Sequence, residues 1–261
     1  MLILTAFLFG TLVGSFLNVC IHRLPGGESI VFPASHCPRC NAAIAPYDNL
    51  PLVSYLVLRG QCRHCAAPIA LRYPVVELLG GLAAAGAALH FGLSAYALIA
   101  FAFLAALIVV TFIDLDHQII PDAISLPGIA VGFAAALLLG QPPWLDSLLG
   151  ILLGGGMLWI VAEGYARLTG REGMGGGDIK LLAMIGAFVG WRGVLVTLLI
   201  ASLVGSVIGV AMMLRRGDDV KMAIPFGPFL AAGGVCALFW SEPLIDWYLR
   251  FGASLSDGIV G

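Results

Sequence analysis

The chain has 261 residues, of which 60% are hydrophobic and only 11% are charged, and its formal net charge is -2. A water-soluble domain normally carries about a quarter charged residues, so this composition excludes an ordinary soluble protein and indicates an all-α, polytopic membrane protein embedded in a lipid bilayer. It also gives no support for binding to nucleic acid, because that function requires a basic face.

Eight apolar runs are candidates for transmembrane helices, each of which needs roughly 20 apolar residues. In chain order they cover residues 2–20, 75–91, 94–113, 123–139, 145–166, 175–189, 194–214 and 224–240. The sixth run is short, because its uncharged apolar part covers only residues 181–189. It crosses the bilayer only if the glycine-rich residues before it also lie at membrane depth. The pattern predicts about eight transmembrane helices.

The first run admits two interpretations, a retained helix or a cleaved signal peptide. No Lys or Arg precedes its apolar residues, and no small-residue cleavage site follows them. A signal peptide normally has both a basic residue before its apolar run and a small-residue cleavage site after it. The sequence therefore favours a retained first helix.

The distribution of basic residues predicts the orientation in the membrane, because Lys and Arg accumulate in short cytoplasmic loops. With an external N-terminus, only Arg192 and Arg250 lie outside. The other eleven face the cytoplasm, namely Arg23, Arg39, Arg59, Arg63, Arg72, Arg167, Arg171, Lys180, Arg215, Arg216 and Lys221. This asymmetry favours both that orientation and the presence of eight spans.

The loop at residues 21–73 is the one polar segment of any size, and it contains four cysteines in two C-x2-C pairs. These are Cys37 and Cys40, then Cys62 and Cys65. Two such pairs are typical of a structural zinc site, in which four thiolates complete a tetrahedral shell. Two disulfides or a redox-active pair are the alternatives, but a cytoplasmic compartment disfavours disulfides. We expect a small zinc-binding domain whose folding depends on the metal.

Acidic residues follow the third run in the segment "TFIDLDHQIIPD", which contains Asp114, Asp116 and Asp122. Ionisable groups at membrane depth are costly and are candidates for function. Asp116 and Asp122 fit a solvated turn beside Pro121, which can start the next helix. Asp114 directly follows the apolar run, on the last helical turn, and fits that interpretation less well.

Asp178 opens the sixth run on the same predicted side, directly after Gly175, Gly176 and Gly177. Glycines remove side-chain bulk, so a substrate backbone can approach the carboxylate closely. The alternative is a linker followed by an aspartate that caps a helix. Lys180 either pairs with Asp178, contacts a ligand or extends to the membrane interface. Two acids at one depth on different helices suggest an aspartyl dyad that shares a proton.

Seven segments together resemble the bacterial prepilin peptidases, the type IV leader peptidase family of membrane aspartyl proteases. They are "GSFLNVCIHRLP", the two C-x2-C pairs, "RYPVVELLGG", "IDLDHQIIPD", "REGMGGGDIKLLA" and "IPFGPFLAAGG", in this order over nearly the whole chain. The resemblance implies that Asp114 and Asp178 are the catalytic aspartates. It implies cleavage of the basic leader of type IV prepilins or type II secretion pseudopilins at the cytoplasmic face of the bacterial inner membrane.

The resemblance also implies methylation of the new N-terminus from S-adenosylmethionine, although the sequence contains no Rossmann glycine pattern for that cofactor. Glu77, shortly inside the second run, is a candidate contributor to this second activity. The alternative is a structural carboxylate bonded to a neighbouring helix. Four parts are then expected: a first helix (1–20), a zinc domain (21–73), a membrane-embedded peptidase domain (74–241) and a short tail (242–261).

Two other classes of function compete with the peptidase. An ion- or proton-coupled transporter also uses intramembrane acids and glycine-broken helices, but it predicts charges near the bilayer centre and a structural repeat. Neither feature is clear in the sequence. An assembly scaffold built around the zinc loop would leave the aspartates without a role.

Overall fold

The computed structural model describes residues 1–170, 175–216 and 225–260. Seven helices in this part of the chain are long and apolar enough to cross a membrane. The expected all-α membrane architecture is therefore confirmed. Arg171, Lys221 and residue 224, where the eighth run was expected to begin, lie outside the described residues.

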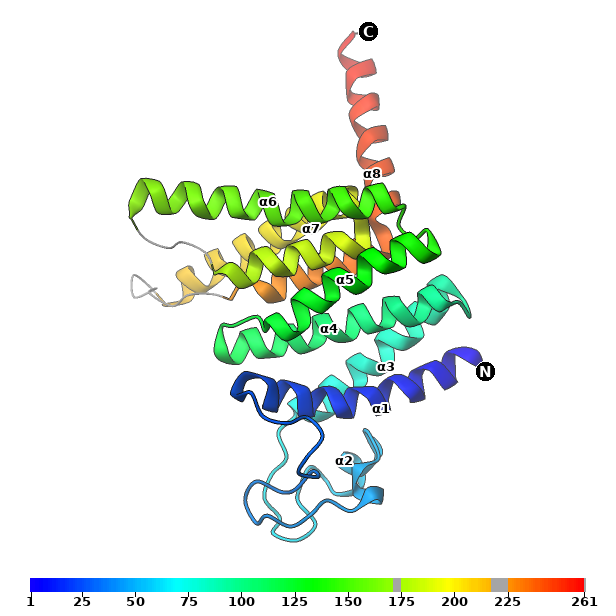
Figure 1. Cartoon of the computed structure of the whole chain (residues 1–261), viewed down its shortest axis with the longest axis vertical. Coiled ribbons are helices and arrows are strands. Elements are labelled where there is room, and N and C mark those ends of the chain that lie inside the picture. The colour runs from blue at the N-terminus through cyan, green and yellow to red at the C-terminus, as the bar shows by residue number, and fades with distance from the viewer. Residues whose placement is uncertain (171–174, 217–224, 261) are drawn as a thin grey trace. The chain divides into compact units, whose positions relative to one another are not determined.

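The chain divides into two compact units, Met1–Pro121 and Asp122–Gly261. In the first unit, α1 packs along both α3 and α4, and the segment between α1 and α3 forms a polar loop at one end of these helices (Figure 1). The elements of this unit are α1 (Leu2–Arg23), η1 (Leu24–Gly26), η2 (Pro46–Asn49), α2 (Val53–Val57), α3 (Arg72–Phe91) and α4 (Ala95–His117).

Small residues let α1 and α3 approach backbone to backbone. A Cβ atom placed on Gly14 would lie 2.7 Å from the Cα of Glu77, and one placed on Gly80 would lie 2.9 Å from the Cα of Gly14. Gly10 lies one turn before Gly14 on the same face of α1. Stripes of small residues are a common way for membrane helices to associate, since water does not drive their packing. This contact holds Glu77 close to α1.

Helix α4 is longer than its apolar run. It continues to His117 and ends where Gln118 adopts a left-handed conformation with φ of 54°. The N–H of Gln118 donates to the carbonyl of Asp114 at 2.9 Å, which is the usual closure of such a helix end. Asp114 lies on the last turns, as expected. The assignment of Asp116 to a solvated turn was wrong, because this residue is still helical.

The second unit contains α5 (Asp122–Leu139), α6 (Trp144–Thr169), α7 (Gly176–Arg216) and α8 (Gly227–Val260). Helix α7 contacts each of the other three. It is interrupted at Gly190, whose φ of 70° and ψ of 177° are not helical. The parts before and after this break correspond to the sixth and seventh runs. The first part has only 14 residues, about 21 Å at the usual rise of ~1.5 Å per residue.

Close helix contacts also hold α7 within this unit. A Cβ on Gly154 of α6 would lie 2.6 Å from the carbonyl oxygen of Leu182. On the α5 side, a Cβ on Gly132 would lie 2.8 Å from both Ala187 and Phe188. The short first part of α7 is therefore clamped from two sides, and its register is set by backbone contact.

Candidate functional site

The polar loop is built from two similar turns, each carrying one C-x2-C pair. In the first turn, the N–H of Cys37 donates to Ala42 at 2.9 Å. In the second, the N–H of Cys62 donates to Ala67 at 2.8 Å. The fifth residue of each turn, Asn41 or Ala66, has a positive φ, of 54° and 53° respectively.

The two turns match at a constant offset along the chain. The isolated bridge between His36 and Ala43 has its counterpart between Gln61 and Pro68. A hydrogen bond from Ile44 to Ser35 likewise has its counterpart from Ile69 to Gly60. The loop is therefore an internal repeat of one turn, and each copy presents two thiols.

The four cysteine sulfurs form one cluster. Cys37, Cys40, Cys62 and Cys65 have Sγ atoms that all lie within 4.8 Å of one another, and the Sγ atoms of Cys37 and Cys65 are 3.8 Å apart. Tetrahedral zinc with Zn–S bonds of about 2.3 Å requires sulfurs about 3.8 Å apart. None of the four is in a disulfide. The arrangement fits a metal ion with four thiolate ligands.

Backbone N–H groups in the turns prepare the thiols for this role. Hydrogen bonds from the backbone of Cys40 and Arg39 lower the pKa of the Cys37 thiol to about 6. Hydrogen bonds from the backbone of Cys65 and His64 likewise lower the pKa of Cys62. Because the thiolate is the form that binds metal, each turn favours the ligand state of its first cysteine.

Polar contacts hold the loop to itself and to α1. The guanidinium of Arg23, at the end of α1, donates to the carbonyls of Ser29 and Pro33 at 2.9 and 2.7 Å. Arg63 forms an ion pair with Asp48, with Nε to Oδ2 at 2.7 Å, and this partner lowers the pKa of the Asp48 carboxyl. These contacts link the start, the middle and the second turn of the loop.

Glu77 joins the loop to the helices. It is half-buried on α3, and its Oε2 accepts a hydrogen bond at 2.8 Å from the N–H of Leu52, directly before α2. The Glu77 carboxylate also forms a hydrogen bond with the side chain of Ser15 on α1, so its contacts include both the loop and the neighbouring helix that the structural alternative expects. Among the ion pairs formed by the described residues, none includes Glu77.

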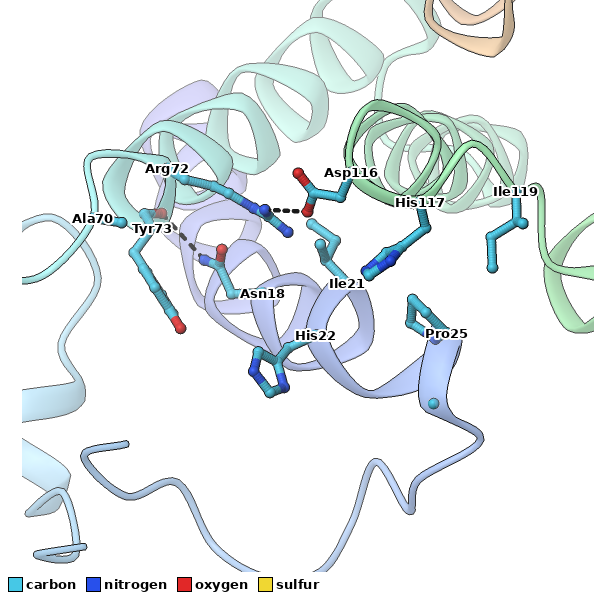
Figure 2. Close-up of a pocket in the computed structure, with 11 residues that line it drawn as sticks. Asn18, Ile21, His22, Pro25, Ala70, Arg72, Tyr73, Asp116, His117 and Ile119 are labelled. Carbon is cyan, nitrogen blue, oxygen red and sulfur yellow. Dashed lines mark hydrogen bonds and ion pairs between the residues drawn. The ribbon is translucent and has the colours of Figure 1, made fainter. Parts of the chain in front are cut away.

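Two cavities of about 740 Å³ each lie in the first unit. The loop cavity extends from the cysteine turns to Glu77 and is also lined by Val19 and Tyr73. The helix-end cavity lies where α1, α3 and α4 end, and Figure 2 shows Asn18, His22, Arg72, Tyr73, Asp116 and His117 around it. Both cavities are lined by Asn18, His22, Ala70 and Tyr73, so they share a wall.

Asp114 lies one turn before the residues of α4 that line the helix-end cavity. Its side chain is only 5% exposed, whereas Asp116 is exposed. Asp116 forms an ion pair with Arg72, whose guanidinium also lies 5.5 Å from the ring centre of Phe112 (Figure 2). The pair ties the end of α4 to the start of α3 and orients the turn that carries Asp114.

Asp178 lies in the first turn of α7, where its N–H donates to the carbonyl of Gly175 at 3.2 Å. The helix begins at Gly176, so Gly176 and Gly177 are helical and not extended, and Asp178 is not the N-cap. No atom of the described residues lies within 4 Å of a Cβ placed on Gly176. Packing therefore does not require glycine at that position.

Lys180 forms an ion pair with Asp122, at the start of α5. Its Nζ donates to both carboxylate oxygens of Asp122 at 2.7 Å. The sequence did not suggest this partner, because the two residues are 58 positions apart and lie on different helices. The one available signal was that both charges flank apolar runs at the same predicted membrane face.

The fold and the loop define a multi-pass membrane protein with a cluster of four cysteines that could hold a metal ion. Residues 8–91 match the bacterial peptidase A24 N-terminal domain, and residues 101–210 match the type IV leader peptidase family. No solved structure matches the chain.

Curated relatives extend this similarity over nearly the whole chain. Three are named "Prepilin leader peptidase/N-methyltransferase". The one from Aeromonas salmonicida (strain A449) is 40% identical over 93% of this chain and 92% of its own length. The one from Pseudomonas aeruginosa is 41% identical over 95% of this chain and 94% of its own length. The one from Burkholderia pseudomallei (strain 1026b) is 37% identical over 95% of this chain and 87% of its own length.

The chain belongs to the type IV leader peptidase family. This is a protease family, so the protein is an enzyme, and the resemblance found in the sequence is confirmed. The relatives give no support to the alternative of a transporter.

Proposed function

We propose that this enzyme removes the leader peptide from type IV prepilins or type II secretion pseudopilins and then methylates the new N-terminus from S-adenosylmethionine. The observation that carries this proposal is the identity of 40% over 93% of the chain to a prepilin leader peptidase/N-methyltransferase. Such coverage includes both the cysteine loop and the helices that carry the acids.

The proposed catalytic residues are Asp114 and Asp178. In an aspartyl dyad one carboxylate is ionised and takes a proton from water, and the other is protonated and donates to the carbonyl oxygen of the scissile bond. The burial of Asp114 beside the exposed Asp116–Arg72 pair supports a special role for it. The close packing of the first part of α7 at Leu182 and Ala187, directly after the turn that carries Asp178, supports a fixed position for Asp178.

Gly175, Gly176 and Gly177 leave room for the substrate backbone beside Asp178. The open space around Gly176 supports this role, since a side chain there would meet no described atom. Because Gly176 and Gly177 already belong to α7, the substrate would approach the first helical turn and not an extended strand.

We propose that Cys37, Cys40, Cys62 and Cys65 bind zinc as a structural ion. Four thiolates fill a tetrahedral shell and leave no open position for a reacting water. The sulfur separation of 3.8 Å supports this assignment. The ion fastens the two turns together and takes no part in hydrolysis.

We further propose that the protein lies in the bacterial inner membrane with the loop in the cytoplasm. The asymmetry of Lys and Arg supports this orientation. The end of α4 that carries Asp114 and the end of α1 that enters the loop both border the helix-end cavity, so these two features share one face of the first unit. An enzyme that cuts a leader at the cytoplasmic end of the substrate's apolar helix needs its catalytic carboxylates at the cytoplasmic face of the membrane.

The test is to incubate the detergent-purified, metal-loaded protein with a prepilin and labelled S-adenosylmethionine, and to measure leader release and methyl incorporation together. We expect both. Intact prepilin after prolonged incubation would refute the peptidase proposal, whereas cleavage without label would refute only the methylation.

A further inference from the structure

We propose that the loop cavity binds the methyl donor, a cationic sulfonium nucleoside, with Glu77 facing its positive charge. The assignment rests on the proposed methylation. The assignment adds a binding site for the donor, between the cysteine loop, α1 and α3.

The dimensions of the cavity suit such a ligand. Its volume of about 740 Å³ lies within the range of roughly 300–1,000 Å³ that is usual for small-molecule sites. It is bounded by Val19 and Tyr73 from the helices and by Leu50 and Leu58 from the loop. Mostly apolar walls with a few polar groups are typical of sites for drug-sized ligands.

The charge on Glu77 indicates the sign of the ligand. The other charged residues on the cavity wall are either paired or exposed: Asp48 pairs with Arg63, and Arg23 donates to two carbonyls. Glu28 and Arg39 are exposed. Glu77 is half-buried, and its hydrogen-bond partners, the N–H of Leu52 and the side chain of Ser15, are both neutral. A carboxylate withdrawn from water without a cation is costly. A ligand with a positive sulfur and a positive amine supplies the missing charge.

The shared wall gives the acceptor a route to the donor. The helix-end cavity reaches Asp116 and His117, one turn beyond Asp114, and meets the loop cavity at Asn18, His22 and Tyr73 (Figure 2). An N-terminus that enters the helix-end cavity therefore lies against the wall that this cavity shares with the proposed donor site. The proposed donor site and Asp114 therefore belong to the same unit.

The transfer balances without a further reactant. The new α-amine, whose pKa is about 8, loses a proton to solvent in a fraction of the molecules. Its lone pair attacks the methyl carbon and forms the C–N bond, while the C–S bond breaks and the sulfur keeps the bonding electrons. The positive charge passes from sulfur to nitrogen.

Calorimetric titration of the full metal-loaded protein tests the site directly. The probes are S-adenosylmethionine and S-adenosylhomocysteine, which lacks the charge on sulfur. In Glu77→Gln, which retains an acceptor for Leu52, we expect the affinity for S-adenosylmethionine to fall at least tenfold and that for S-adenosylhomocysteine to fall less. In Val19→Phe, which fills the cavity, we expect both affinities to fall.

The control is Leu12→Phe, on the same helix but 56% exposed and away from the cavity, which should bind both ligands like the wild type. Equal metal content and melting temperature show that the variants are folded. Wild-type affinity in both Glu77→Gln and Val19→Phe would overturn the assignment. If the wild type binds the donor in a Glu77-dependent manner but does not process prepilin, the proposed function fails and the site stands.

Discussion

The Nζ of Lys180 lies 2.7 Å from each carboxylate oxygen of Asp122, and this forked ion pair joins the first turn of α7 to the first turn of α5. Asp178 precedes Lys180 by two residues. In the first unit, Asp116 follows Asp114 by two residues and pairs with Arg72. Each candidate catalytic aspartate thus lies next to a residue that is tied to another helix.

Loss of the Lys180–Asp122 pair should affect turnover more than stability. Because both side chains are substantially exposed, Lys180→Met should change stability by only about 0.2–1 kcal/mol. Misplacement of Asp178 should lower kcat by about tenfold to a hundredfold with little change in KM. Steady-state cleavage kinetics measure this split.

The charge-reversed double variant Asp122→Lys, Lys180→Asp should regain part of the lost kcat, because it restores the ion pair with its charges exchanged. Arg167→Met removes a comparable exposed pair with Glu163 on α6 and should cleave normally. Unchanged kcat in Lys180→Met would exclude a positioning role.

Asp114→Asn and Asp178→Asn should each reduce leader cleavage by at least about a thousandfold, because an amide can neither take the proton from water nor share one with a second carboxylate. Asp246→Asn, at an exposed position of α8, is the control and should retain full activity. A substituted enzyme that still cleaves at a tenth of the normal rate would remove that aspartate from the dyad.

Cys62→Ser should lose most of the bound zinc and expose the loop to proteases, since three remaining thiolates bind the ion weakly and the loop depends on it. Elemental analysis of the purified protein and limited proteolysis give the two readouts. Cys236→Ser, on α8, serves as the control and should keep the ion. The assignment of zinc fails if the Cys62 variant keeps one equivalent of metal per chain.

Gly154→Ala should destabilise the second unit, because the added Cβ would lie 2.6 Å from the carbonyl oxygen of Leu182 and force α6 away from α7. Overpacking of this kind costs about 1–3 kcal/mol. On the same helix, Gly156 has no described atom within 4 Å of an added Cβ, so Gly156→Ala should leave the melting temperature unchanged or slightly higher. Equal melting temperatures for the two variants would contradict the close contact.

The sequence predicted what depends on local composition. Apolar runs located the spans, and the matched C-x2-C pairs located a cluster that the structure brings within 4.8 Å. Helix ends were less predictable, because α4 continues past its apolar run through Asp116, where the pair with Arg72 stabilises an extra turn. The break at Gly190 lies between the sixth and seventh apolar runs, where the charged Arg192 had already indicated a boundary.

Relationships between distant residues were beyond the sequence. Nothing near Lys180 identifies Asp122 as its partner, and nothing near Glu77 identifies the N–H of Leu52. The two cavities depend on how the loop folds back over α1 and α3, and a single sequence does not reveal that path. The roles of Asp114 and Asp178 remain proposals that the variants above test.

The duplicated turn of the cysteine loop has a consequence for how this protein matures. Neither copy can complete a four-sulfur shell alone, so the loop has no stable half-assembled form, and both copies must close on the same ion. The loop cavity lies against both copies, so it is complete only after that closure. The supply of metal in the cell would then decide, molecule by molecule, which copies of the enzyme possess a finished cavity.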